Sequence, residues 1–113
     1  MAKVSVLIPV YNQEELIVRA LDSIPKNKDI EIIVCDDGST DNSLKKIILY
    51  VSEHKDIRIL VNPINKGVAY TVNRMIEEAE GEYIVLLGSD DYFYTKQFEK
   101  AMQELNGTDL VYF

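Results

Sequence analysis

The chain has 113 residues, of which 47% are hydrophobic and 27% charged, as expected for one soluble globular domain rather than a disordered segment. There are 12 basic and 19 acidic residues, a formal net charge of -7, and no local cluster of lysine or arginine offsets it. This balance argues against a nucleic-acid partner, whose affinity comes largely from neutralised phosphates. No apolar stretch is long enough to cross a bilayer, and the first residues lack the features of a signal peptide. The single cysteine, Cys35, cannot form an intrachain disulfide, so we expect a reducing, cytoplasmic location and a structural role for Cys35 in the core.

Strand and helix patterns alternate along the whole chain. The apolar, β-branched runs predict strands over 4–10, 31–35, 57–61 and 82–88, and a last strand beginning at 109. Helical spacing of apolar residues predicts helices over 12–24, 39–54, 68–80 and 95–107. The expected helix boundaries are an N-cap at Asn12 paired with Glu15, an N-cap at Thr95, and C-terminal glycines at Gly81 and Gly107.

This alternation predicts a single α/β domain with three layers, in which a mostly parallel sheet has helices on both faces. Ligands bind such sheets beyond the carboxyl ends of the strands, where the strand order reverses. The unusual polar segments of the sequence fall at these ends, as "PVYN", "DDGSTD", "NPINKG" and "GSDDYF". We therefore expect the functional site on that rim.

Several common site chemistries are missing from the rim. There is no G-x-x-x-x-G-K-[ST] phosphate loop, and no G-x-G-x-x-G follows the first strand. A phosphorelay receiver domain would need acidic residues after the first strand, where this chain has "PVYN". With His54 as the sole histidine, and expected on a solvated helix edge, the chain lacks the material for a nucleophilic triad or a zinc site.

Two acidic pairs remain, Asp36–Asp37 and Asp90–Asp91. A hard divalent cation such as Mg²⁺ or Mn²⁺ prefers carboxylate oxygens and often shares its coordination shell with substrate phosphates. The alternative is local loop chemistry, with an aspartate capping a helix or closing a turn, and for Asp36 and Asp41 the two interpretations are about equally supported. That alternative is weaker for Asp90 and Asp91, because Thr95 already supplies the expected cap of the next helix.

Three segments together, "VSVLIPVYNQEELIVRALDSI", "EIIVCDDGSTDNS" and "NKGVAYTVNRMIEEAEGEYIVLLGSDD", resemble the N-terminal half of a family 2 glycosyltransferase with the Rossmann-like GT-A fold. The resemblance covers almost the whole chain, in order and with the expected spacing. It implies a donor that is a nucleotide-diphosphate sugar, usually UDP-linked, bound with Mn²⁺ or Mg²⁺. It further implies transfer of the sugar to an acceptor with inversion at the anomeric carbon, and suggests polysaccharide biosynthesis as one setting.

The resemblance also implies roles for individual residues. Pro9 and Tyr11 would line the base and ribose, and the carboxylate of Asp37 would accept a hydrogen bond from the uracil ring N–H. In the DXD-like region, Asp90 would contact the ribose or the metal, and Asp91 would bind the metal that bridges the diphosphate.

Two departures from the family pattern affect this assignment. Gly88 stands where the family often has a further aspartate, which predicts weaker metal binding. Val72 stands where the family often has an arginine that can bind phosphate. Lys66 or Arg74 could replace that arginine, although a lysine in such a loop is more often simply solvated.

In this family the general base and most of the acceptor site lie in the C-terminal half, beyond Phe113. We therefore expect these residues alone to bind a donor without transferring sugar, and any membrane association to depend on the absent part. The acceptor stays open between polysaccharide, lipid carrier and protein glycan. A non-catalytic nucleotide-binding module is the first alternative. A nucleotidyltransferase ranks below it, because "PVYNQEE" lacks the glycine-rich basic loop that holds a triphosphate.

Overall fold

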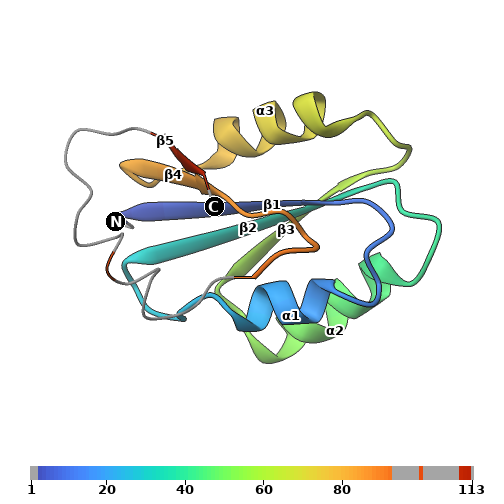
Figure 1. Cartoon of the computed structure of the whole chain (residues 1–113), viewed down its shortest axis with the longest axis horizontal. Coiled ribbons are helices and arrows are strands. Elements are labelled where there is room, and N and C mark those ends of the chain that lie inside the picture. Colours follow the sequence, from blue (N-terminus) through green and yellow to red (C-terminus); the bar gives the residue numbers. More distant parts are fainter. Residues whose placement is uncertain (1–2, 93–99, 101–109, 113) are drawn as a thin grey trace.

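The computed structural model describes residues 3–92, 100 and 110–112, and this part of the chain forms one parallel sheet with helices on both sides (Figure 1). The strands are β1 (Val4–Val10), β2 (Ile30–Asp37), β3 (Ile57–Asn62), β4 (Tyr83–Leu86) and β5 (Leu110–Tyr112), and the helices are α1 (Ile17–Asp22), α2 (Ser43–Glu53) and α3 (Val68–Glu78). The strand order is β3-β2-β1-β4-β5, and every pair of neighbours is parallel. The predicted α/β class is therefore confirmed.

The strands β1 and β2 are mostly apolar because both of their faces are covered. In β1 every residue except Pro9 is buried, and β2 is buried from Ile32 to its end. Continuous apolar runs of this kind are typical of parallel strands inside a three-layer fold. The register pairs Val10 with Asp36, so the chain leaves β1 directly beside the acidic end of β2.

The helices form two separate layers. Helices α1 and α2 cover one face of the sheet and α3 covers the other (Figure 1). Alternate strand residues divide between two buried clusters, one facing α1 and α2 and containing Val6, Ile8, Ile17, Leu21 and Ile47, and the other facing α3 and containing Leu7, Ile33, Cys35 and Met75. Each fully buried Leu or Ile side chain stabilises the fold by about 1.5–3 kcal/mol. The predicted place of Cys35 in the core is confirmed.

The first helix begins later than the sequence predicts. Its N-cap is Leu16, with no side-chain cap, so the predicted pairing of Asn12 with Glu15 is wrong. Asn12 has a φ of 50°, in the left-handed region that asparagine tolerates better than most residues. Its Oδ1 accepts a hydrogen bond from the backbone N–H of Thr40 at 2.8 Å. A contact with a distant loop thus replaces the local cap.

Gly81 is not the C-cap of α3, as the sequence predicted. The helix ends at Glu78, and its cap residue Ala79 is extended. A Cβ on Gly81 would lie 2.6 Å from the backbone nitrogen of Ser5, and the N–H of Gly81 donates to Oγ of Ser5 at 2.8 Å. A side chain is excluded here because the chain passes close to β1 before entering β4.

The helix predicted over 95–107, with its boundaries at Thr95 and Gly107, lies outside the described residues. Of the last predicted strand, residues 110–112 are described and pair with β4. Within the described residues, no helix combines the length and the apolar character needed to cross a membrane.

Candidate functional site

The strand order reverses at β1, whose neighbours are β2 on one side and β4 on the other. In Figure 1 the loops that follow β1, β2 and β3 gather at one end of the sheet, on the right of the view. This is the location at which open α/β sheets bind ligands. The rim predicted from the sequence is therefore assembled by the fold.

A pocket of about 270 Å³ opens on this rim. Its lining residues come from the ends of β1 and β2, from the loop before α3 and from the first residue of α3, and they are Pro9, Val10, Tyr11, Asp37, Asn65, Gly67 and Val68. Three of the predicted site residues, Pro9, Tyr11 and Asp37, thus lie around one pocket. Tyr11 keeps 45% of its surface exposed, so its ring is available to a ligand.

Asp37 is the best-anchored side chain of the pocket. It is only 4% exposed, yet hydrogen-bond donors surround its carboxylate. Oδ1 accepts from Nδ2 of Asn62 at 2.9 Å and from the backbone N–H of Lys66 at 2.7 Å, while Oδ2 accepts from the N–H of Gly67 at 3.0 Å. Each carboxylate oxygen has about two acceptor positions. Oδ2 accepts one of these three bonds, and the side chain of Thr71 is a further hydrogen-bond partner of the carboxylate.

The same hydrogen bonds keep Asp37 ionised. Burial raises the pKa of its carboxyl, because a charged group loses hydration inside the protein. The bonds from the Lys66 N–H, the Asn62 amide and the Gly67 N–H lower the pKa by more, so that it lies below its usual value. The pocket thus holds a fixed, charged acceptor at neutral pH.

Behind the pocket lie Asn62 and Thr71, which were not identified from the sequence, and Arg74, which was predicted in a different role. Asn62 ends β3, and its amide donates to both Asp37 and Oγ1 of Thr71, the latter at 3.0 Å. Nη1 of Arg74 donates to Oδ1 of Asn62 at 2.8 Å. The available signal was the position of Asn62, a polar residue at the carboxyl end of a strand that lies beside β2.

Two aspartates, one at the end of β2 and one in the loop that follows, accept hydrogen bonds in local turns. Oδ2 of Asp36 accepts from the N–H of Ser39 at 3.1 Å, and Oδ1 of Asp41 accepts from the N–H of Ser43 at 2.9 Å. Burial raises the pKa of Asp41, but the hydrogen bonds from the hydroxyl and N–H of Ser43 lower it by more, to below its usual value. The interpretation of Asp36 and Asp41 as loop residues is supported, and the functional interest of this segment falls on Asp37.

Asp90 and Asp91 follow β4 and are exposed. The N–H of Asp91 donates to the carbonyl oxygen of Gly88 at 2.9 Å and closes a tight turn. A Cβ on Gly88 would lie 3.1 Å from Oδ1 of Asp90 and 2.9 Å from Oδ2 of Asp91. Both carboxylates therefore approach the same space beside Gly88.

Two converging carboxylates fit a divalent cation that receives its other ligands from a substrate. Mg²⁺ is commonly bound by one or two carboxylates together with phosphate oxygens and water. Among the residues that the structure describes, no group of three or more His, Cys, Asp and Glu side chains could hold a metal without such help. The turn after β4 thus brings two carboxylates together, and these two alone do not complete a metal site.

The basic residues predicted to replace the missing arginine differ in availability. Arg74 donates to the carbonyl oxygen of Val61 and to Asn62, which directs it toward the support of Asp37 rather than toward a phosphate. Lys66 is exposed, and its Nζ lies 5.9 Å from the ring centre of Tyr70. Val72 is half-buried and packs against the core on the α3 side.

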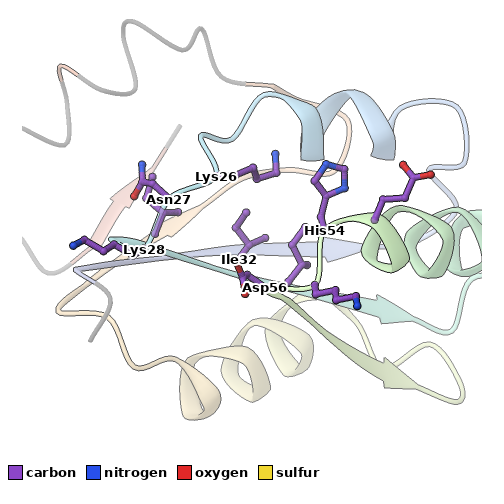
Figure 2. Close-up of a pocket in the computed structure, with 10 residues that line it drawn as sticks. Lys26, Asn27, Lys28, Ile32, His54 and Asp56 are labelled. Atoms are coloured by element: carbon purple, nitrogen blue, oxygen red, sulfur yellow. The ribbon is translucent and has the colours of Figure 1, made fainter.

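A second pocket, of about 370 Å³, lies at the opposite end of the strands, where β2 and β3 begin (Figure 2). Lys26, Lys28 and His54 line it, together with the acidic Asp56. His54 stacks on Tyr50 with ring centres 4.1 Å apart, and its Nδ1 lies 3.0 Å from the carbonyl oxygen of Tyr50. None of the predicted site residues lies here, and we assign the pocket no role.

Comparisons of the sequence and of the structure with known proteins both find glycosyltransferases. The sequence profile of "Glycosyl transferase family 2" matches residues 5–113. An uncharacterised glycosyltransferase of Haemophilus influenzae is 35% identical over 98% of this chain and 45% of its own length. The poly(ribitol-phosphate) beta-glucosyltransferase of Bacillus spizizenii is 42% identical over 80% of this chain and 15% of its own length.

Two solved structures share the fold. S. aureus TarS 1–349, solved in complex with UDP-GlcNAc, has a TM-score of 0.78 and 31% identity, covering 89% of this chain and 30% of TarS 1–349. The mannosyltransferase PcManGT from Pyrobaculum calidifontis, in complex with GDP-Man and Mn²⁺, has a TM-score of 0.83 and 25% identity, covering 89% and 31% of the two chains. The chain thus spans less than half the length of these relatives, and the predicted GT-A fold is confirmed. With its family profile matched from residue 5 to residue 113, the chain belongs to glycosyl transferase family 2.

Proposed function

We propose that this chain is the donor-binding part of a glycosyltransferase, and that it binds a UDP-linked sugar together with Mn²⁺ or Mg²⁺. The observation that carries the proposal is Asp37, an ionised and firmly oriented acceptor in the wall of the rim pocket. Uracil presents a ring N–H that can donate to such a carboxylate. Pro9 and Tyr11, which line the same pocket, would contact the base and the ribose.

The relatives support this class of ligand. TarS was solved with UDP-GlcNAc and PcManGT with GDP-Man and Mn²⁺, and uracil and guanine both carry a ring N–H. A carboxylate acceptor is compatible with either base. We favour uracil because the family resemblance is to enzymes that usually take UDP-linked donors.

Asp91 would bind the cation and Asp90 would contact the cation or the ribose. Their carboxylates converge beside Gly88, just after β4. Strand β4 pairs with β1, whose end lines the rim pocket. When bound, the cation would neutralise charge on the diphosphate as it leaves. The exposed Lys66 would add a contact to the phosphates from the loop before α3.

The transfer itself would require residues outside this chain. Inversion at the anomeric carbon needs a base close to the acceptor hydroxyl, and we assign that role to no residue here. Positioning of the acceptor contributes up to about 7–11 kcal/mol to such reactions. We therefore expect these residues alone to bind the donor and to transfer no sugar at a measurable rate.

Calorimetric titration of the chain with UDP, with and without Mn²⁺, tests the proposal. We expect binding that strengthens with Mn²⁺ and is lost in Asp91→Asn, a nearly isosteric change at an exposed position. Asp56→Asn, at the opposite end of the strands, is the matched control and should bind UDP as the wild type does. UDP affinity that is indifferent to Mn²⁺, or unchanged in Asp91→Asn, would contradict the metal assignment. An incubation with labelled UDP-sugar and a panel of acceptors would reveal a base within this chain if labelled product formed.

A further inference from the structure

Arg19 reaches from α1 to the acidic turn that follows β4, across 71 positions of sequence. Its Nη2 donates to the backbone carbonyl oxygen of Asp90 at 2.7 Å. Its Cζ also lies over the ring of Tyr92, 4.4 Å from the ring centre, which is a cation–π distance. One exposed side chain thus contacts the segment on both sides of Asp91.

The way in which Arg19 makes these contacts leaves the carboxylates available. It bonds the main-chain oxygen of Asp90, and neither of the ion pairs within the described residues joins it to Asp90 or Asp91. The two carboxylates approach Gly88 instead. A guanidinium this close still lessens the repulsion between two neighbouring negative charges.

We propose that Arg19 is a positioning residue, which fixes the turn from Gly88 to Tyr92 so that Asp90 and Asp91 present their carboxylates together to the cation. The inference rests on the proposed function, since it concerns how the metal-binding part of that site is held. An arginine suits this role because its planar group can lie on an aromatic ring while an N–H in the same plane donates to a carbonyl oxygen. A lysine at this position would supply charge and a donor without the planar stacking.

The first test needs no ligand and examines the turn alone. In Arg19→Met, we expect the ring-proton chemical shifts of Tyr92 to move and hydrogen exchange at the Asp91 amide to accelerate. Arg58→Met is the matched control, because Arg58 is also exposed and also donates to a backbone carbonyl oxygen, that of Glu78, at 3.0 Å. It should leave both signals unchanged. Urea unfolding midpoints for the two variants would establish that both are folded.

The second test measures UDP affinity by calorimetry with saturating Mn²⁺ and without it. We expect Arg19→Met to weaken the Mn²⁺-dependent affinity about 10-fold, the lower end of the effect of residues that orient metal ligands. Affinity without Mn²⁺ should change little, and Arg58→Met should match the wild type. Arg19→Lys should recover part of the loss.

The outcomes separate this inference from the proposed function. Loss of Mn²⁺-dependent affinity in Arg19→Met, together with a changed turn, supports the positioning role. An unchanged turn, or a changed turn with undiminished Mn²⁺-dependent affinity, overturns it. Full recovery in Arg19→Lys would overturn the part played by the stacked plane. A wild-type chain whose UDP affinity ignores Mn²⁺ would overturn the proposed metal site, and the positioning role with it, even if the NMR signals of the turn respond to Arg19→Met.

Discussion

Arg74 orients the side-chain amide of Asn62, because its Nη1 donates to Oδ1 of Asn62 at 2.8 Å. With the amide oxygen engaged in this way, Nδ2 faces the carboxylate of Asp37 at 2.9 Å. Asn62 is 3% exposed and Asp37 is 4% exposed, so this hydrogen bond helps to satisfy two buried polar groups, in addition to the Lys66 N–H that bonds Asp37 and the Thr71 oxygen that bonds the Asn62 amide. The charged acceptor of the rim pocket is thus held by a short chain of side chains from β3 and α3.

Replacing Asn62 with leucine should destabilise the fold by about 1–3 kcal/mol, because Oδ1 of the buried Asp37 would lose one of its two donors and Nη1 of Arg74 would lose an acceptor. Asn73→Leu, on the exposed part of α3, is the matched control and should change stability by no more than about 0.5 kcal/mol. Urea unfolding followed by circular dichroism measures both. Equal midpoints for the two variants would contradict the supporting role of Asn62.

Stability should fall in acid because the folded-state pKa values of Asp37 and Asp41 are lowered. A lowered carboxyl pKa stabilises the fold fully above the unfolded value, about 3.9 for aspartate, and the contribution disappears as pH falls through the folded value. We therefore expect a contribution that is constant from about pH 7 to pH 5 and declines below about pH 4. Asp37→Asn should show a smaller decline in urea unfolding over this range. A decline identical to that of the wild type would contradict the assignment to Asp37.

The base preference of the pocket should depend on the charge of Asp37. Cytosine presents an unprotonated ring nitrogen where uracil presents an N–H, so CDP should bind more weakly than UDP by about 1–3 kcal/mol. Asp37→Asn should reduce this difference, measured by calorimetry with both nucleotides. Asp41→Asn is the control, since Asp41 is an aspartate of the same loop that does not line the pocket. An undiminished preference for UDP in Asp37→Asn would show that another group reads the base.

Gly88→Asp should strengthen Mn²⁺ binding by adding a third carboxylate beside Asp90 and Asp91. The new Cβ would meet only the ends of those two flexible side chains, at 3.1 and 2.9 Å, so the turn can accept it. Without metal, the three like charges should lower stability. Gly88→Asn has nearly the same shape without the charge, and should bind Mn²⁺ less tightly than Gly88→Asp. Titration of both variants with Mn²⁺ measures the two affinities. Equal affinities would contradict a metal site beside Gly88.

The loop after β2 packs closely against the loop before α3, and substitutions of Gly38 and Gly67 test this contact. Gly38 has a φ of 69°, and a Cβ there would run into the backbone of Asn65 and lie 2.5 Å from the carbonyl carbon of Ile64. Gly67 has a φ of 92°, but a Cβ there would meet nothing within 4 Å. Gly67→Ala should therefore lose only the backbone preference, about 1–2 kcal/mol, whereas Gly38→Ala should lose about 1–3 kcal/mol more from steric overlap. Similar unfolding midpoints for the two variants would contradict the close packing of these loops.

Much of the architecture follows from local patterns of sequence. The runs that form β1 and β2 are mostly apolar because both faces of these strands are covered, and a run of this kind is typical of a central parallel strand. The alternation with helices then places Pro9, Tyr11, Asp37, Asp90 and Asp91 at one end of the sheet. The family resemblance supplied their proposed roles, which composition and spacing do not contain.

Where the sequence interpretation failed, a tertiary contact had replaced a local one. Asn12 is a residue type that often caps helices, yet its side chain accepts a hydrogen bond from the N–H of Thr40, in the loop after β2. Gly81 has the position of a helix terminator, yet it is required by the close passage of the chain beside Ser5. Local propensity could not reveal either contact, because each joins segments that are far apart in sequence.

The sequence by itself determined the order of strands and helices, the rim on which polar residues collect, and the presence of two acidic pairs. Only the tertiary structure decided which aspartates close turns and which one faces the pocket, because that depends on donors from other segments. The N–H groups of Lys66 and Gly67 reach Asp37, about 30 positions earlier in the chain, only after β2 and β3 have paired. In the same way, the contact of Arg19 with Asp90 exists only because the fold brings the side chain of Arg19 on α1 to the turn after β4. Hydrogen bonds act over about 3 Å, so the fold must bring such groups together before their chemistry is defined.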